Sequence, residues 1–460
     1  MLSLPDSFLS RMKELLGADY PAFLHAMTEE GQARAFRVNT VKLSVSDFTA
    51  HAPFSLAPIP YAPDGFYFDG EKIGHYPCHH AGMIYAQDPG AMAALCALPD
   101  IRGGRVLDVC AAPGGKSAQL AAAVGPAGLL VSNEYVASRC RELSGNIERL
   151  GIPNAIVMNT DAPTLAALYP GYFDLTLVDA PCSGEGMFRK SAEARALWSE
   201  ENVRRSAERQ AEILRAAAAT VRRGGYLLYS TCTFSVEEDE GQVNAFLRAH
   251  PDFSLCPVPE SLSRHTAPGI DLPGAVADLA LCRRFYPHIA PGEGQFFALM
   301  RRADGDRRPA APAFSDARAP LPRADRAPLA AALSDLFAPG CVPDVSAFAA
   351  VRGGYALLPD APLPPYGVLA AGVAAGEMRK GVFFPHHQLF TTYGYAMRRK
   401  ISLAGEGADT ARYLHGDTLD LPAQENGYTA VLLYDTPMGG GKMVNGTLKN
   451  LYPKGLRRMQ

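Results

Sequence analysis

Two cysteines, Cys182 and Cys232, stand where a thiol could do chemistry, because each follows the end of an apolar, strand-like run. The surrounding stretches are LVDAPCSGEG (177–186) and GGYLLYSTCTF (224–234). A structural cysteine normally lies inside such a run, where it behaves as a small apolar side chain. In open parallel sheets, ligands bind beyond the carboxyl ends of the strands. A thiolate at that edge is a nucleophile for covalent catalysis, and a second thiol would supply a group for the later release step.

A turn of small residues, CAAPGGKS (110–117), joins the strand-like run RVLDVC (105–110) to the helix-like run KSAQLAAAVG (116–125). The turn nearly matches the phosphate-loop pattern G-x-x-x-x-G-K-[ST], but Cys110 stands where the first glycine is required. A tight glycine turn ahead of a helix still lets a ligand approach the backbone closely. By itself the turn fits a ligand site and a plain structural turn about equally well.

Three acids close the strand-like runs that follow this turn. Glu134 lies about 20 residues beyond the turn, where a carboxylate can accept hydrogen bonds from ribose hydroxyls. Asp161 ends the next run, in position to meet an adenine edge, and Asp179 ends the one after that. A single acid at a strand end is more often a helix cap or a loop charge. Three in series beside a glycine turn predict a nucleoside-binding rim.

The elements that must position these residues alternate between strand and helix. This alternation predicts an α/β fold with a doubly wound parallel sheet. The runs LCRRFYPH (281–288) and GEGQFFALMRR (292–302) suit an antiparallel hairpin at the edge of that sheet. The predicted parallel strands lie within 105–110, 128–135, 154–161, 173–181 and 224–234, and the predicted helices within 116–125, 136–151 and 201–222.

The chain divides into a predicted N-terminal subdomain (1–80), a core (81–302), a linker (303–328) and a C-terminal mixed α/β region (329–460). The linker is rich in Ala, Pro, Arg and Asp and has no apolar period. Short strand-like runs broken by Gly and Pro follow it, namely YALLP (355–359), YGVLAAGV (366–373) and YTAVLLYD (428–435).

Composition excludes several classes of protein. Of the 460 residues, 48% are hydrophobic and 20% charged, which is typical of a globular protein. No apolar run is long enough to span a membrane. The N-terminus, MLSLPDSFLSRMKELLG, fits an amphipathic helix better than a secretory signal, so we expect a cytoplasmic protein.

Charge is informative only at the C-terminus. The net charge is −3 and the pI about 6.4, which gives no whole-chain argument for nucleic acid. The stretch 438–460 is basic and lacks acids, which suits either a surface that contacts RNA or a solvated tail. Its cations are Lys442, Lys449, Lys454, Arg457 and Arg458.

The nine cysteines form no C-x-x-C pair, so we expect reduced thiols rather than a disulfide framework. The stretch HYPCHH (75–80) carries zinc-like ligands but has no second ligand pair farther along the chain. We therefore expect a loop there and no bound metal.

Three motifs together resemble those of the RNA cytosine-5 methyltransferases of the Nop/Sun family, which use S-adenosylmethionine. They are LDVCAAPGGKS (107–117), LVDAPCSGEGMFRK (177–190) and LLYSTCTFSVEEDEG (227–241). GEGMFRK, with the long C-terminal extension, is similar to the RsmF-type bacterial enzymes that act on small-subunit ribosomal RNA. RVNT (37–40) resembles the family's N-terminal Arg-x-Asn element.

Two thiols suit the chemistry of such enzymes. Carbon 5 of cytosine is too weak a nucleophile to attack a methyl sulfonium unaided. A thiolate that adds to carbon 6 turns the ring into an enamine-like nucleophile, provided that a group stabilises the change at N3. After transfer, carbon 5 must lose its proton and the thiol must leave.

The resemblance implies a role for each residue. Cys232 would attack, Cys182 would help release, Asp179 would contact N3, and Lys116 would lower the pKa of the thiol or bind the base. Arg37 and Asn39 would contact RNA. The implied S-adenosylmethionine contacts are Cys110, Ala111, Ala112, Pro113, Gly114, Gly115, Lys116, Glu134, Arg139, Asp161 and Asp179.

The resemblance also implies a fold and a partner. The fold would be a Rossmann-like class I methyltransferase sheet between an N-terminal RNA-binding subdomain and a PUA-like C-terminal RNA-binding region. The partner would be 16S ribosomal RNA or the small ribosomal subunit, with the enzyme as a monomer.

Other functions remain open at this point. The substrate could be transfer RNA or another RNA. A nucleotide hydrolase or kinase could use CAAPGGKS as a degenerate phosphate loop, and a noncatalytic RNA-binding adaptor would need only the flanking regions. Neither of these last two requires two thiols.

Overall fold

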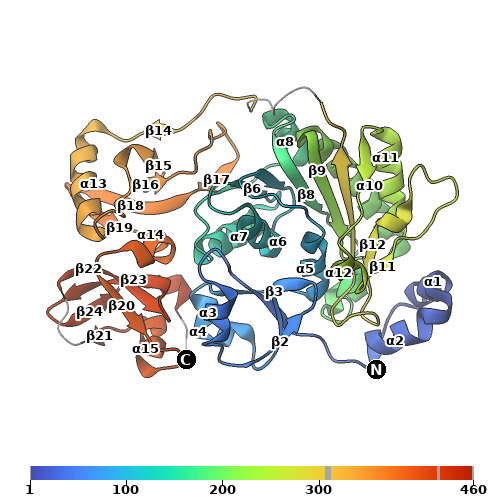
Figure 1. Ribbon diagram of the computed structural model, residues 1–460, viewed down its shortest axis with the longest axis horizontal. Helices are drawn as coiled ribbons and strands as arrows, with labels where there is room; N and C mark the ends of the chain where they lie inside the picture. The colour runs from blue at the N-terminus through green and yellow to red at the C-terminus, as the bar shows by residue number, and fades with distance from the viewer. Residues whose placement is uncertain (1, 306–311, 422–424, 458–460) are drawn as a thin grey trace.

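The computed structural model describes residues 2–305, 312–421 and 425–457, and these fold around one large central sheet (Figure 1). The strands of this sheet are β5 (Arg105–Asp108), β6 (Leu129–Asn133), β7 (Ala155–Met158), β8 (Phe173–Asp179), β9 (Val221–Thr231), β10 (Phe253–Leu255), β11 (Ala267–Pro268), β12 (Arg283–Phe285), β13 (Gln295–Arg302) and β17 (Val368–Ala371). Their order is β11-β12-β13-β9-β8-β5-β6-β7-β17, with β10 beside β13. Strands β9, β8, β5, β6 and β7 are parallel, whereas β12 and β13 continue the sheet antiparallel. The predicted parallel sheet with an antiparallel hairpin on one side is confirmed.

Helices cover both faces of this sheet, as the near-continuous apolar strands require. One apolar core unites one face of the strands with α5, α6 and α7, and a second core unites the opposite face with α8, α10 and α11. Their bounds are α5 (Pro89–Cys96), α6 (Gly115–Val124), α7 (Ala137–Arg149), α8 (Ala162–Leu168), α10 (Glu200–Thr220) and α11 (Glu240–Ala249). The shorter helices α9 (Ala192–Leu197) and α12 (Glu260–Ser263) lie in the connections.

The N-terminal region forms a helix pair and a small sheet. The predicted amphipathic helix is α1 (Asp6–Leu16), which packs with α2 (Tyr20–Thr28) through Phe8 and Phe23. The sheet has the order β2-β3-β1-β4. Its strands are β1 (Ala35–Val38), β2 (Ser55–Ile59), β3 (Ala62–Asp69) and β4 (Ile84–Ala86), and α3 (Val45–Thr49) lies between β1 and β2.

The loop predicted for HYPCHH is wrong. Ile73–His75 forms a turn of 3-10 helix and Pro77–His80 forms the short helix α4. Proline is suited to the first position of a helix because it has no backbone N–H to satisfy there. Cys78 is buried in the apolar core beneath this helix.

The C-terminal region contains two further five-stranded sheets, ordered β14-β15-β16-β18-β19 and β20-β22-β23-β24-β21. Their strands are β14 (Ala319–Pro320), β15 (Phe348–Val351), β16 (Gly354–Leu357), β18 (Val373–Arg379), β19 (Val382–Pro385), β20 (Lys400–Leu403), β21 (Leu419–Asp420), β22 (Gly427–Leu433), β23 (Thr436–Val444) and β24 (Thr447–Asn450), with helices α13 (Arg323–Leu336), α14 (His387–Tyr393) and α15 (Ala408–His415). The predicted linker is not wholly irregular, because β14 and the start of α13 lie within it.

The C-terminal region is joined to the rest of the chain by contacts that the sequence did not reveal. Strand β17 pairs antiparallel with β7 and so becomes the last strand of the central sheet. The core of the last sheet is continuous with that of the N-terminal sheet, and Ile401 and Met438 belong to the same apolar cluster as Phe36. Lys42 crosses this boundary, since its Nζ donates to Ala81 O at 2.8 Å and to Pro437 O at 2.9 Å.

Across the described ranges, none of the helices combines the length and apolar character needed to cross a membrane.

Candidate active site

The thiols of Cys182 and Cys232 meet at the carboxyl edge of the sheet, with their Sγ atoms 3.3 Å apart. They do so because β8 and β9 are adjacent and parallel, with Asp179 opposite Ser230. Cys182 lies three residues beyond the end of β8 and Cys232 directly follows β9, so the starts of the two loops bring the thiols together. The two thiols therefore share one site, and all nine cysteines are free thiols.

A buried carboxylate, Glu185, holds the two thiol loops together. It lies in the loop after β8 and accepts hydrogen bonds from the loop after β9 at 2.8–2.9 Å. The donors are Thr233 Oγ1, Phe234 N and Ser235 Oγ. Gly186 N donates to Cys232 O at 2.9 Å, which closes the contact. Sequence reasoning missed Glu185, whose only signal was an acid among glycines three residues after Cys182.

The Asp179 carboxylate is fixed through both oxygens. Lys116 Nζ, from the first turn of α6, lies 2.8 Å from Oδ2, and Ser230 Oγ donates to Oδ1 at 2.6 Å. Lys116 and Asp179, 63 residues apart, therefore form one charged unit at the edge that carries the thiols.

A pocket of about 200 Å³ lies between the glycine turn and the start of α5. Its wall includes most of the predicted turn residues, namely Cys110, Ala111, Ala112, Pro113, Gly115 and Lys116, together with Asp179. Gly114 has a φ of +114°, a conformation that residues with a side chain rarely adopt. A Cβ on Gly115 would lie 2.9 Å from the Tyr85 ring. Gly114 is therefore required by the backbone conformation of the turn, and Gly115 by the close approach of Tyr85.

Asp108, which sequence reasoning missed, lines the same pocket. Ser117 Oγ donates to its Oδ2 at 2.7 Å, whereas its buried Oδ1 has no hydrogen-bond partner. Burial raises the pKa of this carboxyl to about 7. An unpaired buried carboxylate oxygen is suited to receive a cationic group from a ligand. In the sequence, the sign of Asp108 was an acid just before the glycine turn, at the end of the strand.

Glu134 and Arg139 lie beside the turn, as expected. Glu134 is buried and accepts a hydrogen bond from Val136 N at 2.9 Å. Arg139 Nη2 donates to Ala112 O at 2.8 Å, and Arg139 Nη1 lies 3.7 Å from Glu134 Oε2. The guanidinium thus ties the acid that follows β6 to the turn that follows β5.

Asp161 is exposed and caps helix α8, with Oδ1 accepting from Thr164 N at 2.8 Å. Hydrogen bonds from Thr164 lower the pKa of its carboxyl. The cap is the structural role that a strand-end acid often has, and contact with adenine stays a prediction.

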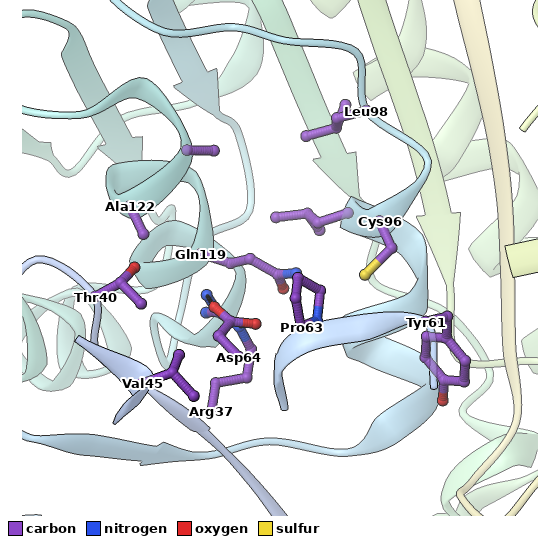
Figure 2. Close-up of a pocket in the computed structure, with 12 residues that line it drawn as sticks. Arg37, Thr40, Val45, Tyr61, Pro63, Asp64, Cys96, Leu98, Gln119 and Ala122 are labelled. Atoms are coloured by element: carbon purple, nitrogen blue, oxygen red, sulfur yellow. Dashed lines mark hydrogen bonds and ion pairs between the residues drawn. The ribbon is translucent and has the colours of Figure 1, made fainter. Parts of the chain in front are cut away.

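Arg37 and Asn39 are held by partners within the protein, and their contact with RNA stays a prediction. Both are buried. Asn39 Nδ2 donates to Gly82 O and Leu150 O, both at 2.8 Å, which docks the N-terminal region on the core. The Arg37 guanidinium is paired with Asp64. Figure 2 shows this pair in the wall of a separate cavity of about 460 Å³, with Gln119 from α6 close by.

The basic C-terminal stretch contributes two exposed lysines to the last sheet. Lys442 in β23 lies directly opposite Lys449 in β24, and Lys442 Nζ is 5.3 Å from the centre of the Tyr428 ring. Like charges directly opposite each other repel unless an anion lies between them. Arg458 lies outside the described residues.

The doubly wound sheet, the glycine turn, the unpaired Asp108 and the acids at the strand ends define an S-adenosylmethionine-dependent methyltransferase with a Rossmann-like fold. Three family models match the chain: "16S rRNA methyltransferase RsmB/F" over residues 96–301, "N-terminal domain of 16S rRNA methyltransferase RsmF" over 4–89, and "Methyltransferase RsmF PUA domain" over 400–458. The chain belongs to this RsmF family of methyltransferases.

Relatives match along nearly the whole chain. Ribosomal RNA small subunit methyltransferase F of Klebsiella pneumoniae is 32% identical over 99% of this chain and 96% of its own length. Among solved structures, a methyltransferase homolog protein from Pyrococcus horikoshii is 29% identical, with a TM-score of 0.58. The match covers 65% of this chain and 96% of that one. NSun6 from Pyrococcus horikoshii, solved with SFG, shares the fold at 22% identity, with a TM-score of 0.55 over 66% of this chain and 100% of its own.

Proposed function

We propose that the protein methylates carbon 5 of a cytosine in 16S ribosomal RNA through a covalent adduct between Cys232 and carbon 6. The observation that carries this proposal is the 3.3 Å contact between the thiols of Cys182 and Cys232 at the edge that holds the cofactor pocket. A methyltransferase acting on a nucleophilic nitrogen or oxygen would need neither thiol. The small-subunit RNA substrate is supported by the names of the relatives that span the chain.

The proposed reaction begins with attack by Cys232 on carbon 6. Asp179, held by Lys116 and Ser230, contacts N3 and shares a proton with it, which neutralises the negative charge that the attack places on the ring, and it takes the proton back when the thiol leaves. The ring then becomes nucleophilic at carbon 5. Cys232 is the attacking thiol because it follows β9, the position that the family resemblance assigns to the nucleophile.

Bound S-adenosylmethionine supplies the methyl group. On the protein side, Asp108 Oδ1 accepts the methionine ammonium and Glu134 accepts the ribose hydroxyls. The glycine turn brings backbone N–H groups close to the ligand, and Asp161 faces the adenine edge.

Release requires that carbon 5 lose its proton and that the bond between Cys232 and carbon 6 break. Cys182, in contact with Cys232, serves this step. The two thiols therefore act in sequence at one site.

The flanking regions hold the RNA. We assign this role to the N-terminal region (1–80) and to the PUA-like region (329–460), where Lys442 and Lys449 face solvent on one sheet. A ribosomal RNA substrate also implies a cytoplasmic protein.

Base-resolution mapping of 5-methylcytosine in RNA from cells with and without the protein tests the proposal. The expected result is the loss of 5-methylcytosine at one or more positions of 16S ribosomal RNA. Loss confined to transfer RNA would change the substrate class, and unchanged maps would refute carbon-5 methylation.

A further inference from the structure

Glu238 lies beneath the loop that carries Cys182. It belongs to the turn between Cys232 and α11, and its side chain is fully buried. Its Oε2 accepts a hydrogen bond from the backbone N–H of Ser183, the residue after Cys182, at 3.0 Å. Gln210 Nε2, from α10, donates to the same oxygen at 2.8 Å and to Pro181 O at 3.0 Å. The carboxylate is thus fixed to the backbone on both sides of Cys182.

The second oxygen of this carboxylate is free to take a proton. Glu238 Oε1 is buried and has no hydrogen-bond partner. A buried carboxylate oxygen without a donor is costly to keep charged, and it gains a partner when a proton is delivered to it. None of the steps proposed above uses this oxygen.

The groups around Glu238 favour proton exchange near neutral pH. Burial raises the pKa of its carboxyl to about 7, and the charge of Glu185 acts in the same direction. The contact with Cys232, burial and the charge of Glu238 raise the pKa of the Cys182 thiol, so this thiol ionises only if an acceptor takes its proton. Asp239 and the Tyr229 hydroxyl also feel the charge of Glu238. These neighbours are all acids, so they favour uptake of a proton by Glu238, and a pKa of about 7 still allows its release near neutral pH.

We propose that Glu238 accepts the proton of the Cys182 thiol, so that Cys182 can act as the base at carbon 5. This inference rests on the proposed function, because it assigns the proton of the release step. Glu238 acts through Cys182 and does not touch the substrate, so it is a positioning residue that also holds a proton.

The proton count closes over one turnover. The Cys182 thiol gives its proton to Glu238 Oε1, and the sulfur keeps the electron pair. The thiolate removes the carbon 5 proton, the C–H pair forms the double bond between carbons 5 and 6, and Cys232 leaves with the pair of its bond to carbon 6. Cys182 then carries the former carbon 5 proton. The proton on Glu238 then goes to water. It accounts for the one proton that the overall replacement of hydrogen by methyl at carbon 5 releases.

A Glu238→Gln variant separates proton transfer from support of the loop. The amide oxygen of glutamine can still accept the Ser183 N–H, but the side chain cannot accept the thiol proton. We expect RNA-linked protein to form at the normal rate and to decay about 100-fold more slowly, which is within the range of general acid–base effects. Decay in the wild type should speed up as pH rises through 7, because Glu238 must be ionised, whereas decay in the variant should lack this transition near pH 7.

Glu237→Gln is the matched control, because Glu237 is the neighbouring acid, is partly exposed and pairs with Arg11. It should release RNA like the wild type. Binding of S-adenosylhomocysteine and a thermal melt check that both variants are folded. If Glu238→Gln does not fold, the wild-type profile decides, and decay that is independent of pH between about 6 and 8 overturns the inference.

A Cys182→Ala variant distinguishes failure of this inference from failure of the proposed function. If Cys182→Ala accumulates RNA-linked protein but Glu238→Gln decays like the wild type, the inference alone is refuted. If no variant forms RNA-linked protein, the covalent mechanism and the inference fail together.

Discussion

Replacing Asp108 with asparagine should stabilise the free protein and weaken cofactor binding at the same time. Asp108 is fully buried, and Ser117 Oγ donates to its Oδ2 at 2.7 Å. Asparagine can keep that hydrogen bond through its amide oxygen, and it carries no charge that burial would penalise. The two effects have opposite signs because the charge that is costly in the free protein is the one that binds the ligand.

The size of the stability effect follows from the pKa of Asp108. Burial raises this pKa from 3.8 to about 7, so the folded protein binds the proton more tightly than the unfolded chain. The contribution of Asp108 to stability is therefore fully present below pH 3.8 and is lost as pH rises to 7. At 1.36 kcal/mol for each pH unit between these values, the loss is about 4 kcal/mol. Asp108→Asn removes this loss, so its advantage should grow from none near pH 4 to about 4 kcal/mol above pH 7.

The effect on binding should also depend on pH. A hydrogen bond between the carboxylate and the methionine ammonium contributes about 1.5 to 3 kcal/mol, so its loss should raise Kd about 10- to 150-fold above pH 7. Below pH 7 the wild type binds a proton at Asp108 in competition with the cofactor, and its affinity should fall toward that of the variant.

Urea unfolding and titration calorimetry with S-adenosylhomocysteine, at several pH values, test both effects. Asp100→Asn is the control, because Asp100 is exposed and pairs with Arg102, so cofactor affinity should not change. Equal stability of Asp108→Asn and wild type across this pH range, or an unchanged Kd at pH 8, would refute the role assigned to Asp108.

Three other predictions address the thiols, the RNA surface and the adenine edge. Cys232→Ala should abolish methyl transfer and form no adduct, whereas Cys182→Ala should accumulate RNA-linked protein on a denaturing gel, because only the nucleophile makes the first bond; the reverse pattern would exchange the two roles. Replacing Lys442 and Lys449 with alanine should lower the slope of log K against log salt by about 0.7 to 0.9 for each lost phosphate contact, as measured by filter binding; an unchanged slope would make this surface a solvated one. Asp161→Ala should cost about 1 kcal/mol of stability, because helix α8 loses its cap. If Asp161 also contacts adenine, the variant should bind S-adenosylhomocysteine more weakly in calorimetry, and an unchanged affinity would rule out that contact.

The parts of the site that could be predicted from the sequence lie where an apolar run ends. Cys182, Cys232 and Asp179 follow such runs, and the parallel topology brings the ends of those runs to one edge of the sheet. Repeated strand and helix patterns determine that topology, so the convergence of the thiols follows from local signals alone.

The parts that could not be predicted depend on partners far away in the sequence. Glu185 and Glu238 are ordinary acids in loops until the fold brings the other thiol loop to them, across 50 and 55 residues respectively. Asp108 is the last residue of β5, but in the sequence it stands within the run RVLDVC, so the end of the strand could not be placed at it. Arg37 and Asn39 match a family motif, but the sequence does not reveal the partners that bury them.

Truncation of the C-terminal region cannot isolate its contribution to RNA binding, because this region also supports the rest of the protein. Strand β17 covers the edge of β7, and Gly367 O accepts the N–H of Asn159 just beyond the end of β7. Removal of residues 329–460 would leave that edge unpaired beside Asp161, and would also expose the part of the apolar core that Phe36 shares with Met438. Any loss of RNA binding would then reflect damage to the cofactor site and the N-terminal region as well. Exposed lysines can be changed without disturbing either contact, so surface substitutions, rather than truncation, can measure what this region contributes to RNA binding.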